Sequence, residues 1–159
     1  MRVRPARAEE ALALTQLCIR SKAHWGYDPE FMRQAAKALT VTSAMIDKSR
    51  VLVAEHRDSG LLGVVAIEPM QPEGRFDLAL LFVEPSAIGK GVGRTLFDAM
   101  VRPAGNQGGR SLSILADPFA APFCQRMGAI KLGEAPSDAI AGRFVPLLEY
   151  EIPEPHVSS

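Results

Sequence analysis

The sequence has few cysteines, no excess of charge of either sign and no long apolar run. Only two cysteines occur in 159 residues, and Cys18 and Cys124 form neither a CxxC motif nor a spaced cluster, so neither a zinc site nor a disulfide framework is expected. No run approaches the ~18 apolar residues of a membrane span, and no apolar signal segment follows the basic N-terminus. These features predict a cytoplasmic protein with no metal site and no membrane partner.

Basic and acidic residues occur in equal numbers, and the composition is that of an ordinary globular protein. Eighteen basic and eighteen acidic residues cancel, so no overall field attracts nucleic acid. Hydrophobic content of 47% with 23% charged residues is ordinary for a globular protein. No internal repeat or linker divides the chain, whose length fits one domain with a substantial core. We expect a single domain over residues 1–152 and a flexible tail over residues 153–159.

Apolar periodicity predicts helices in four places. The first, over residues 8–22, should turn Leu12, Leu14, Leu17 and Cys18 toward the core. The second should begin at Asp28 and Pro29, as N-cap and first helical residue. A third is expected over residues 94–101, followed by a loop over residues 103–109, which contain a proline and three glycines. Asp117 and Pro118 repeat the cap-plus-proline signal, and Pro122 should shorten or bend that last helix.

Short apolar runs bounded by turn residues predict the strands. They are expected near Val3 and over residues 50–56, 61–67, 76–83, 111–116, 129–132 and 144–152, with a loop over residues 135–142. The resulting order is a strand, two helices, three mostly antiparallel strands, a helix, a strand, a helix and two strands. That order predicts a mixed α/β (α+β) fold and not a doubly wound parallel sheet.

Three glycines alternate between the expected strand 76–83 and the helix after it, in Ile88-Gly89-Lys90-Gly91-Val92-Gly93. Glycine lets the backbone approach a ligand closely, and a helix N-terminus attracts anions, so a phosphate-bearing cofactor is the first functional hypothesis. A Walker loop is excluded because no Lys-Ser or Lys-Thr pair follows. A dinucleotide fingerprint is disfavoured because Arg94 stands where its last glycine belongs.

The same loop resembles motif A of the GCN5-related N-acetyltransferases (GNAT). The matching residues are Val83 and Pro85 before the loop, Gly91 and Gly93 within it, and Leu96 after it. Ile88 departs from the pattern, which places glutamine or arginine there. Downstream, the segment from Ala120 to Ala129 resembles motif B, with Asp117 in place of asparagine and Cys124 in place of tyrosine. With the first strand and helix, the resemblance covers nearly the whole chain.

The resemblance implies that acetyl-CoA binds in a V-shaped gap between two splayed parallel strands, residues 76–83 and 111–116. Its pantetheine arm is expected to pair with the strand edge at Leu81, Phe82 and Val83. The other implied cofactor-binding residues are Ile88, Gly89, Lys90, Gly91, Val92, Gly93, Arg94, Asp117 and Phe123. The side chains of Lys90 and Arg94 are interpreted either as phosphate contacts or as solvated surface cations.

Transfer from a thioester needs a deprotonated amine and a proton for the departing thiolate. Asp77 matches a site where some GNAT members carry a glutamate base, and burial would raise its pKa. The alternative interpretation of Asp77 is an exposed strand-end residue or a salt-bridge partner of Arg75. Glu68 and Glu84, at the ends of strands, are alternative bases. Cys124 stands where a proposed tyrosine acid is common, and is either a proton donor or a small buried apolar side chain.

The aromatic residues His24, Trp25 and Tyr27 lie between the first two expected helices, where the family builds its acceptor site. They form either a pocket wall or simple packing of the helix–helix turn. Asp138 and Arg143, in the late loop, are further candidates for acceptor contact.

The resemblance therefore implies an acetyl-CoA-dependent N-acetyltransferase acting on a primary amine of a small molecule or peptide by direct attack on the thioester. The alternative is a catalytically weak CoA-binding regulatory module of the same fold, which the departures at Ile88 and Cys124 suggest. The family often forms homodimers, so a homodimer is a further expectation.

Overall fold

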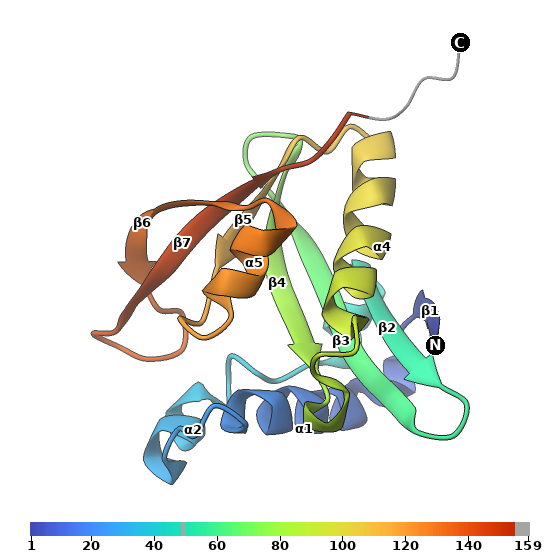
Figure 1. Cartoon of the computed structure of the whole chain (residues 1–159), viewed down its shortest axis with the longest axis vertical. Coiled ribbons are helices and arrows are strands. Elements are labelled where there is room, and N and C mark those ends of the chain that lie inside the picture. The colour runs from blue at the N-terminus through green and yellow to red at the C-terminus, as the bar shows by residue number, and fades with distance from the viewer. Residues whose placement is uncertain (49, 155–159) are drawn as a thin grey trace.

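The computed structural model describes residues 1–48 and 50–154. Within these ranges seven strands form one mixed sheet in the order β1-β2-β3-β4-β5-β7-β6 (Figure 1). The strands are β1 (Arg2–Pro5), β2 (Arg50–His56), β3 (Gly60–Met70), β4 (Arg75–Val83), β5 (Ser111–Leu115), β6 (Ile130–Pro136) and β7 (Phe144–Glu151). The helices are η1 (Ala8–Glu10), α1 (Ala11–Ala23), α2 (Pro29–Ala35), α3 (Ser43–Lys48), η2 (Pro85–Ala87), α4 (Val92–Asn106) and α5 (Ala121–Met127). The expected tail falls outside the described residues after Glu154.

The predicted mixed sheet is confirmed, and the parallel pairing within it is short. β4 and β5 run parallel, whereas the other neighbouring strands are antiparallel. Their pairing begins with Arg75 opposite Ser111 and ends with Asp77 opposite Ser113, although β4 continues to Val83. The two strands therefore separate beyond Asp77 and leave the rest of that edge of β4 open.

Helices cover both faces of the sheet. Because successive strand residues point to opposite faces, Val65 and Ile67 of β3 join one core while Val64 and Ala66 join the other. The first core contains Leu96, Phe97, Met100 and Val101 of α4, and the second contains Leu14, Leu17 and Cys18 of α1. No helix within the described ranges is long and apolar enough to cross a bilayer.

Four local predictions were wrong, and one of them is the loop expected over residues 135–142, because Ala135 and Pro136 still pair with β7 as part of β6. Leu12 is 70% exposed, because the phase of α1 that buries Leu14 and Leu17 turns Leu12 away from the sheet. The expected loop 103–109 is helical as far as Asn106, with Pro103 inside α4. Packing outweighs the lost backbone hydrogen bond there, since Ala104 is fully buried and a Cβ on Gly105 would lie 2.9 Å from the carbonyl oxygen of Pro153.

The last helix also starts later than predicted. The N–H groups of Ala120 and Ala121 donate to the carbonyl oxygen of Asp117, forming a turn, and α5 begins only at Ala121. Pro122 therefore lies in the first turn of α5, where a missing N–H costs nothing, and not inside the helix. The carboxylate of Asp117 accepts a hydrogen bond from the N–H of Phe119 at 2.8 Å but leaves its other oxygen for longer-range contacts.

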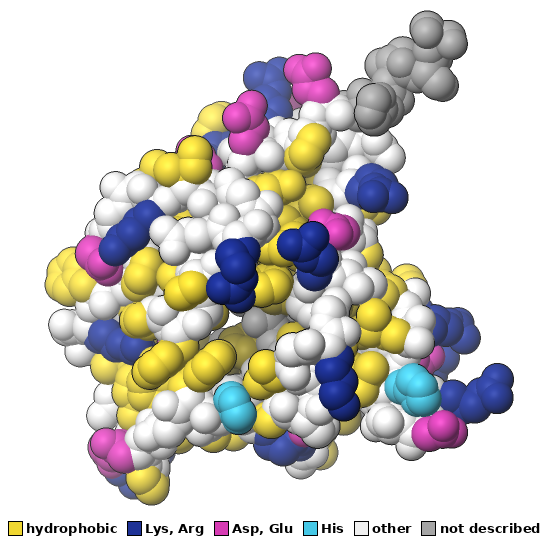
Figure 2. Space-filling model, in the orientation of Figure 1, with side chains coloured by type: hydrophobic (Ala, Val, Ile, Leu, Met, Phe, Trp, Pro, Cys, Tyr) yellow, Lys and Arg dark blue, Asp and Glu magenta, His cyan; other side chains and the backbone are white. Residues whose placement is uncertain are grey.

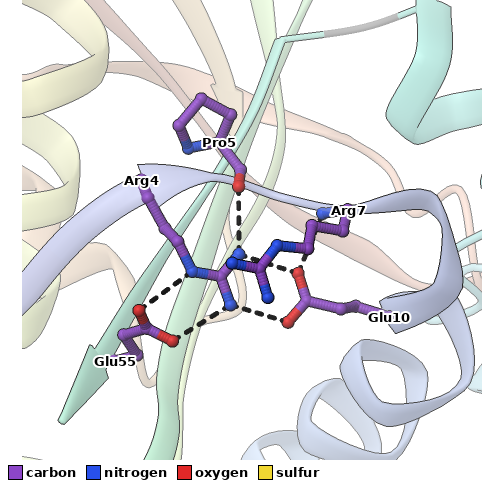
Figure 3. A network of polar contacts seen from close by, with 5 residues as sticks. All are labelled: Arg4, Pro5, Arg7, Glu10 and Glu55. Carbon is purple, nitrogen blue, oxygen red and sulfur yellow. Dashed lines mark hydrogen bonds and ion pairs between the residues drawn. The ribbon is translucent and has the colours of Figure 1, made fainter. Parts of the chain in front are cut away.

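A buried arginine ties the N-terminal strand to the sheet (Figure 3). Arg4 of β1 is 7% exposed, and its guanidinium donates to both carboxylate oxygens of Glu10 at 2.9 and 2.8 Å. It also contacts Glu55 of β2, with Nη2 3.0 Å from Oε2. Glu10 in turn accepts a hydrogen bond from the backbone N–H of Arg7. These contacts fix η1, and with it the start of α1, on the edge of the sheet.

Candidate functional site

The separation of β4 and β5 opens a cavity of about 570 Å³ between them. A hollow flanked by basic and apolar side chains is visible on this face of the molecule (Figure 2). Its walls come from the second half of β4, the loop before α4, the end of β5 and the face of α5 that carries Phe123, Arg126 and Met127. The predicted gap between the two splayed strands is thus a real cleft.

The edge of β4 that faces the cleft carries Leu81, Phe82 and Val83, the residues predicted to pair with an extended ligand. One of its N–H groups is already occupied, because Val83 donates to the hydroxyl oxygen of Ser21 at 3.4 Å. Ser21 is a buried residue of α1 that the sequence interpretation missed. Its contact fixes the end of α1 beside the strand edge.

The glycine loop lies at one end of the cleft. Gly89 and Gly91 have φ values of 83° and 82°, a region that only glycine adopts without strain. A Cβ at either residue would meet no protein atom within 4 Å, so the space beside the backbone is open to a ligand. Gly91 is the N-cap of the 15-residue helix α4, whose first turn presents unpaired N–H groups. Gly93 needs its small size for another reason, since its Cβ would lie 3.2 Å from the ring of Phe123.

Basic side chains accompany these N–H groups. Arg94 of α4 and Arg126 of α5 both line the cleft, whereas Lys90 is exposed, does not line it, and donates its N–H to the carbonyl oxygen of Ala87. Arg126 was missed by the sequence interpretation. Arg126 could have been predicted from helical periodicity, because it follows Phe123 by three residues and lies on the same face of the helix. Ile88 lines the cleft as an exposed apolar side chain.

A polar network crosses the cleft at its other end. The Asp117 carboxylate forms an ion pair with Lys22 of α1 and accepts a hydrogen bond of 2.8 Å from the hydroxyl of Tyr27. That hydroxyl in turn accepts a hydrogen bond of 2.9 Å from Nη2 of Arg143. Burial alone would raise the pKa of Asp117, but the hydrogen bonds from Lys22, Phe119 and Tyr27 outweigh it and lower the pKa. The carboxylate is therefore held ionised.

Aromatic rings pack beside this network. Trp25 stacks on Phe119 with ring centroids 5.3 Å apart, and both residues line the cleft. His24 contacts the edge of Trp25 and does not line the cleft. Tyr27 stacks on Phe31, with centroids 3.9 Å apart. Of the five residues predicted to contact an acceptor, the structure brings Trp25, Tyr27 and Arg143 together around Asp117, whereas Asp138 lines only the second cavity described below.

A second cavity of about 150 Å³ adjoins the first. The two share walls formed by Lys22, Ala79, Phe82, Leu115, Ala116 and Asp117. Beyond that boundary the second cavity is lined by the loop that follows β6, including Ser137, Asp138 and Ala139, and by Arg143. A molecule in the second cavity would therefore lie next to the end of the cleft.

The candidate bases occupy different environments. Asp77 lies half-buried at the last paired position of β4 and β5, opposite Glu68 on β3, and lines neither cavity. Burial, followed by the charges of Glu68 and Asp138, raises the pKa of Asp77. Glu84 instead forms an ion pair with Arg20 at 2.6 Å near the surface. No group of three potential metal-ligating side chains occurs among the described residues.

Cys124 is 4% exposed and lines the cleft beside Phe123. Burial raises the pKa of its thiol to about 11. The thiol therefore stays protonated at neutral pH, and its side chain belongs to the core cluster that contains α4.

Comparison with known proteins agrees with this geometry. The family model described as acetyltransferase (GNAT) domain matches residues 14–144. A search of curated proteins gives no match. Among solved structures, a GCN5-related N-acetyltransferase from Rhodopseudomonas palustris superposes with a TM-score of 0.76 at 23% identity, over 94% of each chain. The PaiA N-acetyltransferase of Thermoplasma acidophilum, in complex with coenzyme A, gives 0.75 at 14% identity over 94% of this chain and 98% of its own.

YncA from Salmonella typhimurium, solved with acetyl-CoA, superposes over 100% of this chain and 98% of its own, with a TM-score of 0.68 at 18% identity. At these levels of sequence identity, the superpositions establish only the fold of this chain.

Proposed function

The chain belongs to the GNAT acetyltransferase family, and from that membership we propose that it transfers the acetyl group of acetyl-CoA to a primary amine of a small molecule or peptide. The observation that carries this proposal is the cleft between β4 and β5, which ends at a glycine loop and a helix N-terminus. It joins an open strand edge to an anion-binding end, as a long ligand with a pyrophosphate requires.

The residues of the cleft fit such a ligand. The N–H groups of Gly89, Gly91 and the first turn of α4 would hold the pyrophosphate, with Arg94 and Arg126 adding charge. The strand edge from Leu81 to Val83 would hold the pantetheine arm through its backbone groups other than the N–H of Val83, which donates to Ser21. Ile88 supplies no side-chain donor, and the binding of phosphate by backbone groups compensates for that loss.

When bound, acetyl-CoA supplies an activated acyl group with a thiolate as its leaving group. The chain itself must place the amine and accept its proton. We assign proton acceptance to Asp77, because burial raises its pKa and it lies where β4 and β5 separate, two residues before Ala79, which lines both cavities. Glu68, directly opposite on β3, is the alternative base. We assign Cys124 to packing, because a thiol with a pKa of about 11 is a weak proton donor.

Binding and turnover are tested separately. The single tryptophan, Trp25, lines the cleft, so acetyl-CoA should change its fluorescence with a saturable dependence on concentration. Arg126→Gln should weaken that binding, while Arg102→Gln, an exposed residue of α4 outside the cleft, should not. Absence of saturable binding would overturn the proposal.

Turnover is measured as release of free CoA in the presence of a panel of amines, using a thiol reagent. Both cysteines are buried, so the protein adds little background. Release that depends on the amine supports the transferase. Saturable acetyl-CoA binding without release across the panel would favour the CoA-binding regulatory module, for which the departure at Ile88 is the supporting observation.

A further inference from the structure

Arg143 lines the second cavity without a carboxylate partner. The ion pairs found within residues 1–48 and 50–154 do not include it, whereas Arg4, Arg20 and Arg75 are each paired with a glutamate. Its only side-chain hydrogen bond among the described residues runs from Nη2 to the hydroxyl of Tyr27. A guanidinium has five N–H donors in a rigid fork, so most of its donors are open to a ligand.

The guanidinium is nevertheless held in place. Its carbon lies 4.8 Å from the ring centroid of Phe31 and 5.2 Å from that of Tyr27. The backbone around it is closed by two hydrogen bonds, from Ser137 N–H to the Arg143 carbonyl oxygen at 2.7 Å and from Arg143 N–H to the carbonyl oxygen of Ile140 at 3.2 Å. A side chain fixed in this way loses little conformational entropy when a ligand binds.

An acidic group lies on the same cavity. Asp138 lines it and is close enough to Asp77 for its charge to raise the pKa of that residue. Lys22 and Asp117 also line the cavity but are paired with each other, so the remaining charges that it presents are a cation at Arg143 and an anion at Asp138. Its wall at Ala79, Leu115 and Ala116 is shared with the cleft, at the end where β4 and β5 separate. These charges complement a small molecule that carries both an ammonium group and a carboxylate.

We propose that the second cavity binds an amine acceptor that carries a carboxylate, of the amino-acid type, and that Arg143 determines this specificity by a bidentate contact with the carboxylate. This inference rests on the proposed acetyl transfer and names the class of its acceptor. The amine would point toward the shared wall and the carboxylate away from it, at the guanidinium fork. The small volume of the cavity restricts the acceptor to short molecules.

The test compares acceptors that differ only in the carboxylate. Glycine, alanine, β-alanine and γ-aminobutyrate are each assayed beside the corresponding carboxamide, which has the same shape and no negative charge. The wild-type protein should prefer the carboxylate member of its best pair by tenfold or more in kcat/KM. Arg143→Gln should remove that preference mainly by raising KM, since hydrogen bonds to charged groups contribute on the order of tenfold to a hundredfold in binding.

Two further variants control for folding and for charge. Arg143→Lys keeps the positive charge without the fork, so it should retain part of the preference. Arg102→Gln removes an exposed arginine of α4 and should leave the preference unchanged. Thermal unfolding and acetyl-CoA affinity are measured for each variant, and a change confined to KM for carboxylates distinguishes recognition from loss of structure.

The outcomes separate this inference from the proposed function. Equal turnover of carboxylates and carboxamides, or of plain amines alone, overturns the inference and leaves the acetyl transfer intact. If no amine is turned over, binding decides: N-acetylglycine and N-acetylglycinamide are titrated into the CoA-loaded protein, followed by Trp25 fluorescence. Saturable binding of N-acetylglycine alone, lost in Arg143→Gln, supports the carboxylate site, and its absence in the wild type overturns it.

Discussion

The hydroxyl of Tyr27 donates a hydrogen bond of 2.8 Å to Oδ2 of Asp117, joining the segment between α1 and α2 to the end of β5. The same oxygen is paired with Lys22, and the side chains of Lys22 and Asp117 are 14% and 9% exposed. These contacts connect the two halves of the molecule at the boundary between the cleft and the second cavity. Asp117 therefore stabilises the site through these contacts and also lines it.

Replacing Asp117 by asparagine should destabilise the protein. The change leaves Lys22 with a neutral partner and weakens two further hydrogen bonds, which we expect to lower the free energy of unfolding by about 1–3 kcal/mol at neutral pH. Because the pKa of Asp117 is lowered from its usual 3.8, the stabilisation is present above that pH and is lost as the pH falls through the folded-state pKa. Urea denaturation at pH 7 and at pH 3 measures the difference.

The exposed residue Asp47 of α3 supplies the control, and Asp47→Asn should change the free energy of unfolding by less than about 0.5 kcal/mol. If Asp117→Asn unfolds at the same urea concentration as the wild type at pH 7, the network contributes no net stability.

Asp77→Asn should lower activity and raise stability together. Removal of a general base costs on the order of 10²–10⁴-fold in rate. Burial and the charges of Glu68 and Asp138 raise the pKa of Asp77 above 3.8, so its ionisation opposes folding increasingly as the pH rises from 3.8 through the folded-state pKa. Asparagine removes that cost, and the variant should unfold at higher urea concentration at pH 7 and show no such gain at low pH.

The pH dependence of kcat/KM distinguishes a base from a structural residue. The wild type should lose activity on the acid side with the titration of Asp77, and Asp77→Asn should lose that limb. Unchanged turnover between pH 6 and 9 would exclude Asp77, and Glu68→Gln would then be the variant to examine.

Cys124→Ala should have little effect on catalysis. The thiol is buried and its pKa is about 11, so it is a poor donor of the proton that the leaving thiolate needs. We expect kcat to stay within about tenfold of the wild type, below the effect of a true acid–base residue. A larger loss in kcat at saturating acetyl-CoA, with unchanged thermal stability, would assign the proton transfer to Cys124.

Much of the fold could be predicted because its signals are local. The positive-φ glycines, the apolar strand 76–83 and the capping of α2 by Asp28 each depend on neighbouring residues. The polar network could not be predicted in the same way. Its hydrogen bonds join residues 95, 90 and 116 positions apart, so they exist only once the sheet has formed. Pro103 shows the converse, since tertiary packing overrides a local breaker.

Glu10→Gln should destabilise the N-terminal strand and change the acid stability of the protein. The hydrogen bonds from Arg4 lower the pKa of Glu10 from 4.5, so their stabilisation is present above that pH and is lost as the pH falls further. The variant leaves the buried Arg4 with Glu55 as its remaining carboxylate (Figure 3), at an expected cost of about 1–3 kcal/mol at pH 7. Glu9→Gln, an exposed neighbour, is the matched control, and equal denaturation midpoints for the two variants would contradict the prediction.

Gly91→Ala separates the conformational cost of the glycine loop from its role in binding. Gly91 and Gly108 have φ values of 82° and 88°, and a Cβ at either would meet no atom within 4 Å. Alanine at either position should therefore lower the free energy of unfolding by about 1–2 kcal/mol through backbone strain alone. Gly91 caps α4 and lines the cleft, whereas Gly108 lies in the turn after α4 and lines neither cavity. Only Gly91→Ala should then weaken acetyl-CoA binding, by about tenfold or more if one backbone contact is lost. Titration calorimetry measures both affinities, and an equal affinity in the two variants would place the phosphates away from this loop.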